Sequence, residues 1–183
     1  MIELDGYKIA KEIYRGTKSI VYKGLRNHDQ IPVIIKILNA EYPDPENVAQ
    51  LKFEYEITKK LNFDGIVKNF ELKKYNNGFA LISEDFGGTS LNEMLGEGFE
   101  IKKFLEIAIS LTLILNDIHK NNIIHKDIKP QNIIFNKETG QIKIADFSIA
   151  SPLLNEKANN TNPIKVKGTF AYMSPEQTGR MNR

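Results

Sequence analysis

Three short apolar runs rich in isoleucine lie close together between residues 123 and 148, and they limit the folds that this chain can adopt. Two of them, Ile123-Ile124 and Ile133–Phe135, flank a polar turn, and the third, Ile142–Ala145, follows a second turn. Short β-branched runs bounded by polar turn residues are typical of buried strands. We therefore predict a hairpin-like scaffold that gathers the polar side chains of its turns at one end.

Five polar side chains belong to this segment: His125, Asp127, Lys129, Asn132 and Asp146. The two carboxylates, the amide and the ammonium among them can position a hydroxyl, bind a divalent cation through oxygen atoms and neutralise phosphate charge. Any one of these residues alone is more typical of a solvated loop. The spacing of the whole set is what favours a functional site.

The order H-x-D-x-K-P-x-N, followed by a strand, a turn, a strand and D-F, resembles the catalytic and metal-binding loops of eukaryotic-type (Hanks-type) serine/threonine protein kinases. The resemblance extends over nearly the whole chain. It implies an α+β, protein-kinase-like fold with two lobes. Residues 1–86 would form a small lobe of five antiparallel strands and one helix, ending in the hinge, and residues 87–183 would form an incomplete larger helical lobe.

The resemblance also implies a role for individual residues of the larger lobe. Asp127 would orient the substrate hydroxyl and accept its proton, and Lys129 would neutralise the transferring phosphoryl group. Asn132 and Asp146 would hold Mg²⁺. Thr169, in the segment G-T-F-A-Y-M-S-P-E, would bridge Asp127 and Lys129. Because tyrosine kinases usually lack the lysine, Lys129 and Thr169 favour serine or threonine as the acceptor.

A second pair of charged residues is expected in the small lobe. The run Pro32–Leu38 is apolar except for Lys36, and alone such a lysine is more typical of an edge strand that is protected from aggregation. A helix predicted after its cap, Asp44, carries apolar residues at helical spacing with Glu54 beside them. In the kinase family this lysine pairs with the α- and β-phosphates of ATP and needs a carboxylate partner. We expect Glu54 to be that partner, with Glu56 as the runner-up.

The turn R-G-T-K-S lies where the family carries its glycine-rich phosphate loop. Aligned on Val21, the chain has Tyr14, Gly16 and Ser19 at the three glycine positions, so that one glycine remains. Glycine matters there because a residue without Cβ lets backbone amides approach a phosphate closely. The resemblance implies that Gly16, Ser19 and Val21 bind the nucleotide, although the turn alone is more typical of an ordinary hairpin.

Further elements complete the expected lobes. Strands are predicted for Val67–Tyr75 and Gly78–Ser83 around an Asn-Asn-Gly turn, a strong hairpin signal. Glu84 and Phe86 resemble the hinge, whose backbone groups bind adenine. The sequence from Ser90 to Glu93 predicts a capping box that opens a short helix.

A long helix is predicted for Ile101–Lys120. Its most apolar part, Phe104–Leu115, is too short to span a bilayer and contains Glu106. We expect a buried helix, partly uncovered because the family's remaining large-lobe helices would lie beyond Arg183. The tail E-Q-T-G-R-M-N-R resembles kinase domains at the N-terminus of large bacterial serine/threonine–histidine kinase signalling proteins, which implies further domains on the C-terminal side.

Composition narrows the classes of partner. A net charge of +2 gives no reason to expect nucleic acid, and the absence of cysteine excludes disulfides and thiolate metal sites. The N-terminus contains acidic residues and lacks the apolar core of a signal peptide. We therefore expect a cytoplasmic protein with a nucleotide and a protein substrate as its partners, no nucleic acid and no membrane span.

Three functional interpretations stay open at this point. The first is an ATP- and Mg²⁺-dependent serine/threonine protein kinase. The alternative is a weak or inactive nucleotide-binding or regulatory fragment (a pseudokinase or a scaffold), which is suggested by the depleted glycine loop, by Ser148 in place of the family's glycine and by the incomplete lobe. The third is a small-molecule phosphotransferase, which Thr169 and the S-P-E segment disfavour.

Overall fold

The structure is a computed structural model that describes residues 3–96, 98–153, 168–175 and 177–178. Its elements are β1 (Tyr7–Arg15), β2 (Ser19–Arg26), β3 (Pro32–Leu38), α1 (Pro45–Lys59), β4 (Asn69–Tyr75), β5 (Gly78–Glu84), β6 (Thr89–Ser90), α2 (Leu91–Met94), α3 (Ile101–Lys120), β7 (Ile123–Ile124), η1 (Pro130–Asn132), β8 (Ile133–Phe135), β9 (Ile142–Ile144), β10 (Ser151–Pro152) and η2 (Phe170–Tyr172).

The chain divides into two compact units. The first consists of Met1–Lys60 and Val67–Gly87, and the second of Leu61–Ile66 and Gly88–Arg183. The short segment before β4 belongs to the second unit because Ile66 forms a β-bridge with Ile144 and the amide of Ile144 donates to the carbonyl of Gly65 at 2.9 Å. The sequence pattern does not show this assignment, because it depends on pairing with a strand nearly 80 residues later.

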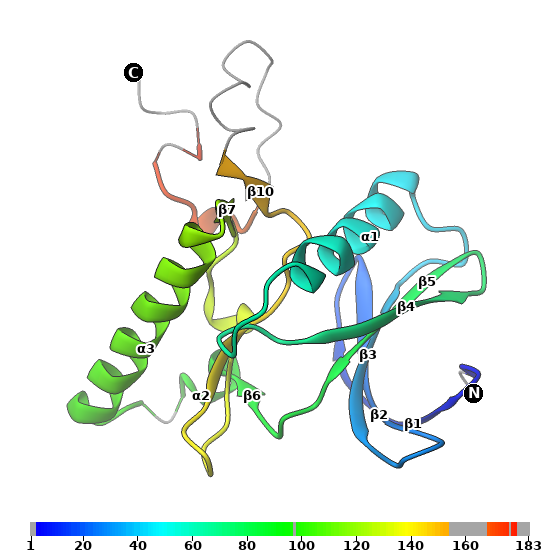
Figure 1. The fold of residues 1–183 in the computed structure, drawn as a ribbon, viewed down its shortest axis with the longest axis horizontal. Coiled ribbons are helices and arrows are strands. Elements are labelled where there is room, and N and C mark those ends of the chain that lie inside the picture. Colours follow the sequence, from blue (N-terminus) through cyan, green and yellow to red (C-terminus); the bar gives the residue numbers. More distant parts are fainter. Residues whose placement is uncertain (1–2, 97, 154–167, 176, 179–183) are drawn as a thin grey trace. The chain divides into compact units, whose positions relative to one another are not determined.

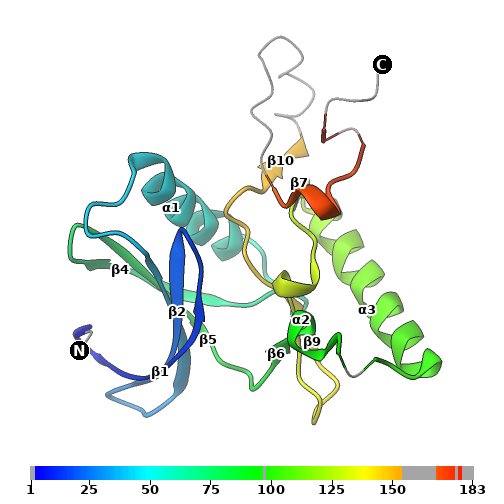
Figure 2. The same cartoon turned by 180° about the vertical axis from the view of Figure 1, so that it is seen from behind.

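The first unit is built on one antiparallel sheet with the strand order β1-β2-β3-β5-β4. Figure 2 shows β1 and β2 side by side as the hairpin at one edge. Alternate residues of β3, namely Val33, Ile35 and Ile37, are buried in the hydrophobic core of this sheet. Lys36 therefore points to the opposite face, because successive side chains of a strand alternate. The predicted five strands and one helix of the small lobe are confirmed.

Helix α1 packs on β4 and β5 and begins as its sequence predicts (Figure 1). The side chain of Asp44 caps it by accepting a hydrogen bond from the amide of Glu46 at 2.7 Å, and proline occupies the first turn. Leu51 and Ile57 are buried from the inner face of the helix. The helix is thus anchored at its N-terminus and along one side.

Strand β4 begins at Asn69, two residues later than predicted, and carries a β-bulge at its start. Asn69 lies opposite Ser83 on β5, but Glu71 lies opposite Ile82, so that Phe70 is the extra residue. A bulge locally reorients the side chains of its strand. This irregularity was not predicted from the sequence.

The second unit contains the hairpin of β8 and β9, in which Ile133 lies opposite Ile144. The hairpin prediction holds for these two runs but is wrong for the first, because β7 pairs with β10 through Ile124 and Ser151. The third run also ends one residue earlier than predicted, at Ile144.

The predicted capping box at the start of α2 is not formed. Ser90 precedes the helix, but its side chain makes no capping hydrogen bond. Ser90 is instead the last residue of β6 and pairs with Ile134 of β8, and α2 extends only from Leu91 to Met94. The strand pairing, rather than a side-chain cap, sets where this short helix begins.

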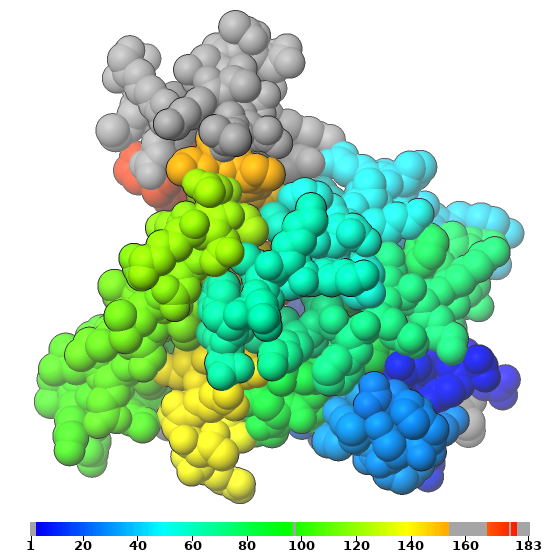
Figure 3. All heavy atoms as spheres, viewed as in Figure 1, coloured from blue at the N-terminus to red at the C-terminus, as the bar shows by residue number. Residues whose placement is uncertain are grey.

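Helix α3 has the predicted bounds but is only half buried. Ile107, Ile114 and Ile118 face the unit's interior. Five of its other apolar residues are exposed: Ile101, Phe104, Leu105, Ile109 and Leu113. The outer side of α3, green in Figure 3, is open along its length. The prediction of a buried helix is therefore wrong for this face, whereas the predicted uncovering of the helix is observed. Within the described part of the chain, no helix is both long enough and apolar enough to cross a membrane.

The two faces of α3 should respond differently to truncation of an isoleucine. Ile118 is fully buried and Ile109 is 61% exposed. We expect Ile118→Ala to lower the free energy of unfolding by about 3 kcal/mol, because it leaves a cavity. Ile109→Ala on the same helix should change it by less than about 0.5 kcal/mol. Urea denaturation of both variants measures the difference, and equal losses would contradict the packing described here.

Candidate functional site

Asp127 is the centre of a polar cluster in the second unit. Its Oδ1 accepts a hydrogen bond from the amide of Thr169 at 2.9 Å, and its Oδ2 lies 2.6 Å from Nζ of Lys129 and 3.1 Å from Nδ2 of Asn132. Nδ2 of Asn132 also donates to the backbone carbonyl of Asp127 at 2.8 Å. Three donors from two segments of the chain thus hold one carboxylate in a defined orientation.

Lys129 joins the two segments of this cluster. Its Nζ donates to Oγ1 of Thr169 at 2.7 Å while it contacts the carboxylate of Asp127. Thr169 therefore contacts both residues that it was expected to bridge, through its amide and its hydroxyl. The ammonium is mostly buried and charged, so that it can also stabilise negative charge that develops on a bound group.

Asn132 and Asp146 come from neighbouring segments and present oxygen atoms. The amide of Ala145 donates to the carbonyl of Asn132 at 2.8 Å, which aligns the two segments. Because Nδ2 of Asn132 donates its hydrogen bonds to Asp127, Oδ1 is the atom of this side chain that can bind a cation. Asp146 has a left-handed backbone with φ of 65°, which is uncommon for a residue other than glycine. Together with phosphate oxygens and water, these two side chains fit the oxygen ligands that Mg²⁺ prefers.

His125 is almost fully buried and contacts the backbone of the cluster. Its Nδ1 accepts a hydrogen bond from the amide of Asp127 at 3.3 Å, and its Nε2 lies 3.1 Å from the carbonyl of Ala145. One neutral tautomer, with the proton on Nε2, satisfies both contacts. The ring also packs edge-on against Phe147, with 4.6 Å between the ring centroids. His125 therefore connects the segment of Asp127 with the segment of Asp146.

Burial lowers the pKa of His125 below its ordinary value, outweighing the opposing effects of the Ala145 carbonyl, Asp146 and Asp127. The unfolded chain consequently binds more protons than the folded chain below about pH 6.5, and stability should fall as the pH drops from there toward the folded-state pKa. We expect a slope of at most about 1.4 kcal/mol per pH unit from this group.

The measurement is the free energy of unfolding of wild type and His125→Gln between pH 7.5 and about 5. The variant should lose the part of the acid-side slope that this histidine causes. His119→Gln, at an exposed position of α3, controls for the removal of a histidine. Identical slopes for wild type and His125→Gln would contradict the buried neutral state.

The first unit contains the second expected pair. Nζ of Lys36 lies 2.8 Å from Oε2 of Glu54, and the glutamate is only 4% exposed. Glu56, the runner-up, is exposed on α1. Val21 of β2 is directly opposite Lys36 of β3 in the register, so that both side chains share one face of the sheet. The structure thus brings Lys36 together with Glu54, its expected partner, and with Val21, a second residue expected to bind the nucleotide.

The turn between β1 and β2 is tied to the end of β3. The amide of Gly16 donates to the carbonyl of Ser19 at 2.9 Å. Nδ2 of Asn39 donates to the carbonyl of Gly16, and the amide of Asn39 donates to the carbonyl of Lys18, both at 2.8 Å. A Cβ at Gly16 would lie 2.6 Å from the hydroxyl of Tyr14, whose ring covers this residue. A side chain at position 16 would therefore require the exposed ring of Tyr14 to move aside.

The segment after β5 is also held within the first unit. Glu84 is bonded to Lys68 twice, since its amide donates to the carbonyl of Lys68 at 2.9 Å and its Oε1 accepts from the amide of Lys68 at 2.8 Å. Asp85 forms an ion pair with Lys23 of β2 at 3.0 Å. Phe86, the other expected adenine-binding residue, follows and is partly buried. These contacts hold the backbone of residues 84–86, the segment that resembles the hinge in sequence.

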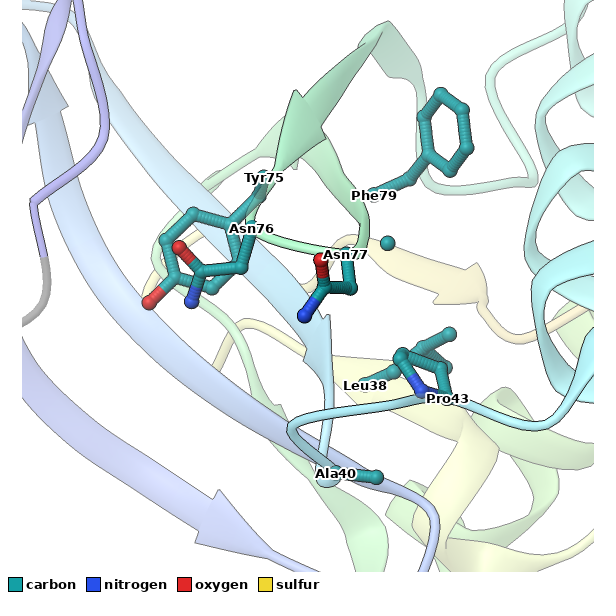
Figure 4. A pocket seen from close by; sticks show the side chains of 8 residues that line it. Leu38, Ala40, Pro43, Tyr75, Asn76, Asn77 and Phe79 are labelled. Atoms are coloured by element: carbon teal, nitrogen blue, oxygen red, sulfur yellow. The ribbon is translucent and has the colours of Figure 1, made fainter.

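Two hollows of the first unit contain none of the expected site residues. A cavity of about 20 Å³ lies beside the β4–β5 turn, between Leu38, Pro43 and Tyr75 (Figure 4). It is large enough for a single water molecule and for nothing as large as a nucleotide. An open hollow of about 910 Å³ follows the N-terminal residues and β1. Neither is therefore a candidate for the chemistry of the polar clusters.

Sequence reasoning missed three residues that hold the site residues. Asn39 ties down the turn that carries Gly16, Asn69 contacts α1 through Thr58, and Gln177 donates to the carbonyl of Lys126 at 2.9 Å. Each acts through side-chain contacts across 11 to 51 residues of sequence. In the sequence, these residues are marked only by an amide side chain that lies close to a predicted strand or motif. Glu176, the last residue of the G-T-F-A-Y-M-S-P-E segment, lies outside the described residues.

Comparisons with known proteins found similarities over nearly the whole chain. A family model described as the protein kinase domain matches residues 7–182. A probable serine/threonine-protein kinase of Clostridium acetobutylicum is 33% identical over 174 residues, covering 93% of this chain and 26% of the relative. The serine/threonine-protein kinase PknL of Mycobacterium bovis is 29% identical over 174 residues, covering 93% of this chain and 43% of the relative. The chain thus spans less than half the length of either relative.

One solved structure supports the fold independently. A crystal structure of a kinase domain superposes with a TM-score of 0.80 at 21% sequence identity, covering 97% of this chain and 59% of that chain. At this identity the match shows the fold and carries no information on substrate.

Proposed function

This chain belongs to the protein kinase domain family, and from that premise we propose that it transfers the γ-phosphoryl group of ATP to serine or threonine hydroxyls of a protein substrate. The observation that carries the proposal is the cluster in which Lys129, Asn132 and Thr169 all contact the carboxylate of Asp127. Such a cluster supplies a proton acceptor and a positive charge within a few ångströms of one another.

The proposed reaction assigns one task to each group of the second unit. The carboxylate of Asp127 accepts a hydrogen bond from the substrate hydroxyl and takes its proton as the oxygen bonds to the γ-phosphorus. The bond from that phosphorus to the bridging oxygen breaks, and ADP leaves. Lys129 stabilises the charge on the phosphoryl oxygens, while Asn132 and Asp146 would hold Mg²⁺, which supplies charge neutralisation when it is bound.

The first unit would bind the nucleotide. Lys36, oriented by Glu54, is proposed to contact the α- and β-phosphates, and the turn with Gly16 and Ser19 to lie along them. Val21 shares the face of Lys36 and offers an apolar surface to the base. Glu84 and Phe86 are proposed to bind adenine through their backbone groups. Catalysis then consists of positioning and charge stabilisation, as is general for phosphoryl transfer.

A second candidate function is nucleotide binding without transfer. Two observations favour it: Tyr14 covers the single glycine of the β1–β2 turn, and Ser148 follows Asp146-Phe147 where the family has glycine. Neither change removes a charged or amide group of the proposed mechanism. For this reason transfer remains the first proposal.

Because the reaction consumes ATP, we propose the cytoplasm as its location. The presence of further C-terminal domains stays a prediction.

The deciding experiment combines transfer and binding. The chain is incubated with Mg²⁺, ATP labelled in the γ-phosphate and a mixture of basic and acidic proteins, and phosphoamino acids are identified after hydrolysis. We expect label on serine and threonine and none on tyrosine. Calorimetric titration with Mg²⁺ and ATP runs in parallel. Binding without transfer would support the second candidate, and the absence of both would overturn the proposal.

A further inference from the structure

Three hydrogen bonds of the first unit lead from the end of β5 to the helix that carries Glu54. Oγ of Ser83 donates to Oδ1 of Asn69 at 2.5 Å, and Nδ2 of Asn69 donates to Oγ1 of Thr58 at 2.8 Å. Thr58 in turn donates to the backbone carbonyl of Glu54, one helical turn earlier, at 2.7 Å. The series crosses three elements, β5, β4 and α1. No residue of it except Glu54 belongs to the proposed chemistry.

These bonds form a specific connection rather than surface contacts. Ser83 and Thr58 are buried, so that an unsatisfied hydroxyl at either position would be costly. The extra residue of the β-bulge, Phe70, directly follows Asn69, whose side-chain amide bridges β5 and α1. All three donors also point the same way along the series, an arrangement in which hydrogen bonds polarise and strengthen one another.

Together with the Lys36–Glu54 pair, the three hydrogen bonds form a closed ring of contacts. Ser83 lies opposite Ile34 of β3, two residues before Lys36. From Lys36 the ring passes to the carboxylate of Glu54, through α1 to Thr58, and back through Asn69 and Ser83 to β3. The turn of α1 that presents the carboxylate is therefore tied, through β4 and β5, to the same sheet that presents the ammonium.

We infer that Thr58, together with Asn69 and Ser83, positions the carboxylate of Glu54 against Lys36. Thr58 acts through Glu54 and touches neither nucleotide nor substrate. The consequence for catalysis rests on the proposed function, because it matters only if Lys36 holds phosphate. The geometric part does not depend on it and can be tested without nucleotide.

The test measures how readily Lys36 reacts with acetic anhydride, by mass spectrometry of the full chain after brief labelling. An ammonium held against a carboxylate is shielded from the reagent. We expect Thr58→Val, which keeps the shape and removes the hydroxyl, to raise the labelling rate of Lys36 about fivefold, the ratio that one lost hydrogen bond gives. Thr58→Ser keeps the hydroxyl and should restore the wild-type rate. Ser83→Ala breaks the series at its far end and should raise the rate in the same direction.

Thr112→Val is the matched control. Thr112 donates to the carbonyl of Ala108 at 2.8 Å, the same bond within a helix, but on exposed α3 in the other unit. Its substitution should leave the labelling of Lys36 unchanged. In a Glu54→Gln background, Thr58→Val should add nothing, because the two changes then act on one interaction.

Two results would overturn the inference: Lys36 labelling at the wild-type rate in both Thr58→Val and Ser83→Ala, or a Thr58→Val effect that persists undiminished with Glu54→Gln. Either would leave the three bonds as ordinary satisfaction of buried groups. If wild type transfers phosphate, Thr58→Val should also raise the KM for ATP about fivefold while kcat changes less. If wild type neither binds nor transfers, the proposed function fails, and the labelling experiment still decides this inference.

Discussion

Asp127→Asn should lower the rate of phosphoryl transfer by about a thousandfold, because a neutral amide cannot accept the proton of the substrate hydroxyl. The affinity for Mg²⁺ and ATP should change little, since the nucleotide is assigned to other side chains. The measurement is the initial rate with γ-labelled ATP beside a calorimetric titration. Unchanged transfer in this variant would refute the proposed mechanism.

The substitution needs a structural control because both carboxylate oxygens of Asp127 accept hydrogen bonds. Whichever way the new amide is oriented, its NH₂ group faces a donor, either the amide of Thr169 or the side chains of Lys129 and Asn132. Asp117→Asn makes the same chemical change on the exposed side of α3 and should leave transfer unchanged. Thermal unfolding of both variants then separates lost chemistry from lost structure.

Lys36→Met should give the second large effect, a fall in kcat/KM of about a hundredfold, because the proposed contact with the phosphates is lost. It should also destabilise the fold by about 3 kcal/mol, since the buried carboxylate of Glu54 loses its ammonium partner. Transfer assays and urea denaturation measure the two quantities separately.

A double variant distinguishes these two causes. Adding Glu54→Leu to Lys36→Met replaces the buried pair by apolar side chains, an exchange that is often neutral for stability. We expect the stability to return close to that of wild type while transfer stays low. Recovery of both properties would show that Lys36 serves the fold alone, and recovery of neither would contradict the ion pair as the source of the destabilisation.

Local sequence patterns were sufficient for one strand and one helix cap of the first unit and for the long helix of the second. Pro32–Leu38 and Ile101–Lys120 have the bounds that their apolar spacing predicts, and Asp44 caps α1 as its position before Pro45 suggests. The pairing of Lys36 with Glu54 was expected from the resemblance to the kinase family, and helical spacing placed Glu54 beside the apolar side of its helix. For the strand, the long helix and the cap, the residues that decide the bounds are close to one another in sequence.

The features that were not predicted from the sequence depend on contacts outside the local pattern. The pairing of β7 with β10 and the missing cap at Ser90 depend on a partner strand that is distant in sequence. The bulge at Asn69 depends on the register of β4 with β5. The exposed face of α3 likewise cannot be distinguished from a buried one by composition, because an apolar residue indicates only that burial would be favourable. Long-range pairing decides these features, and periodicity does not report it.

The two hydrogen bonds from Asn39 to the β1–β2 turn have a consequence for the thermodynamics of any ligand that this turn binds. A glycine-rich loop loses conformational entropy when it closes on a phosphate. Here Gly16 and Lys18 are already immobilised by their bonds to Asn39. The entropy cost of ordering this turn is therefore met when the chain folds and not when a ligand binds. Such preorganisation favours a high affinity for one ligand over the ability of the turn to adapt to different ligands.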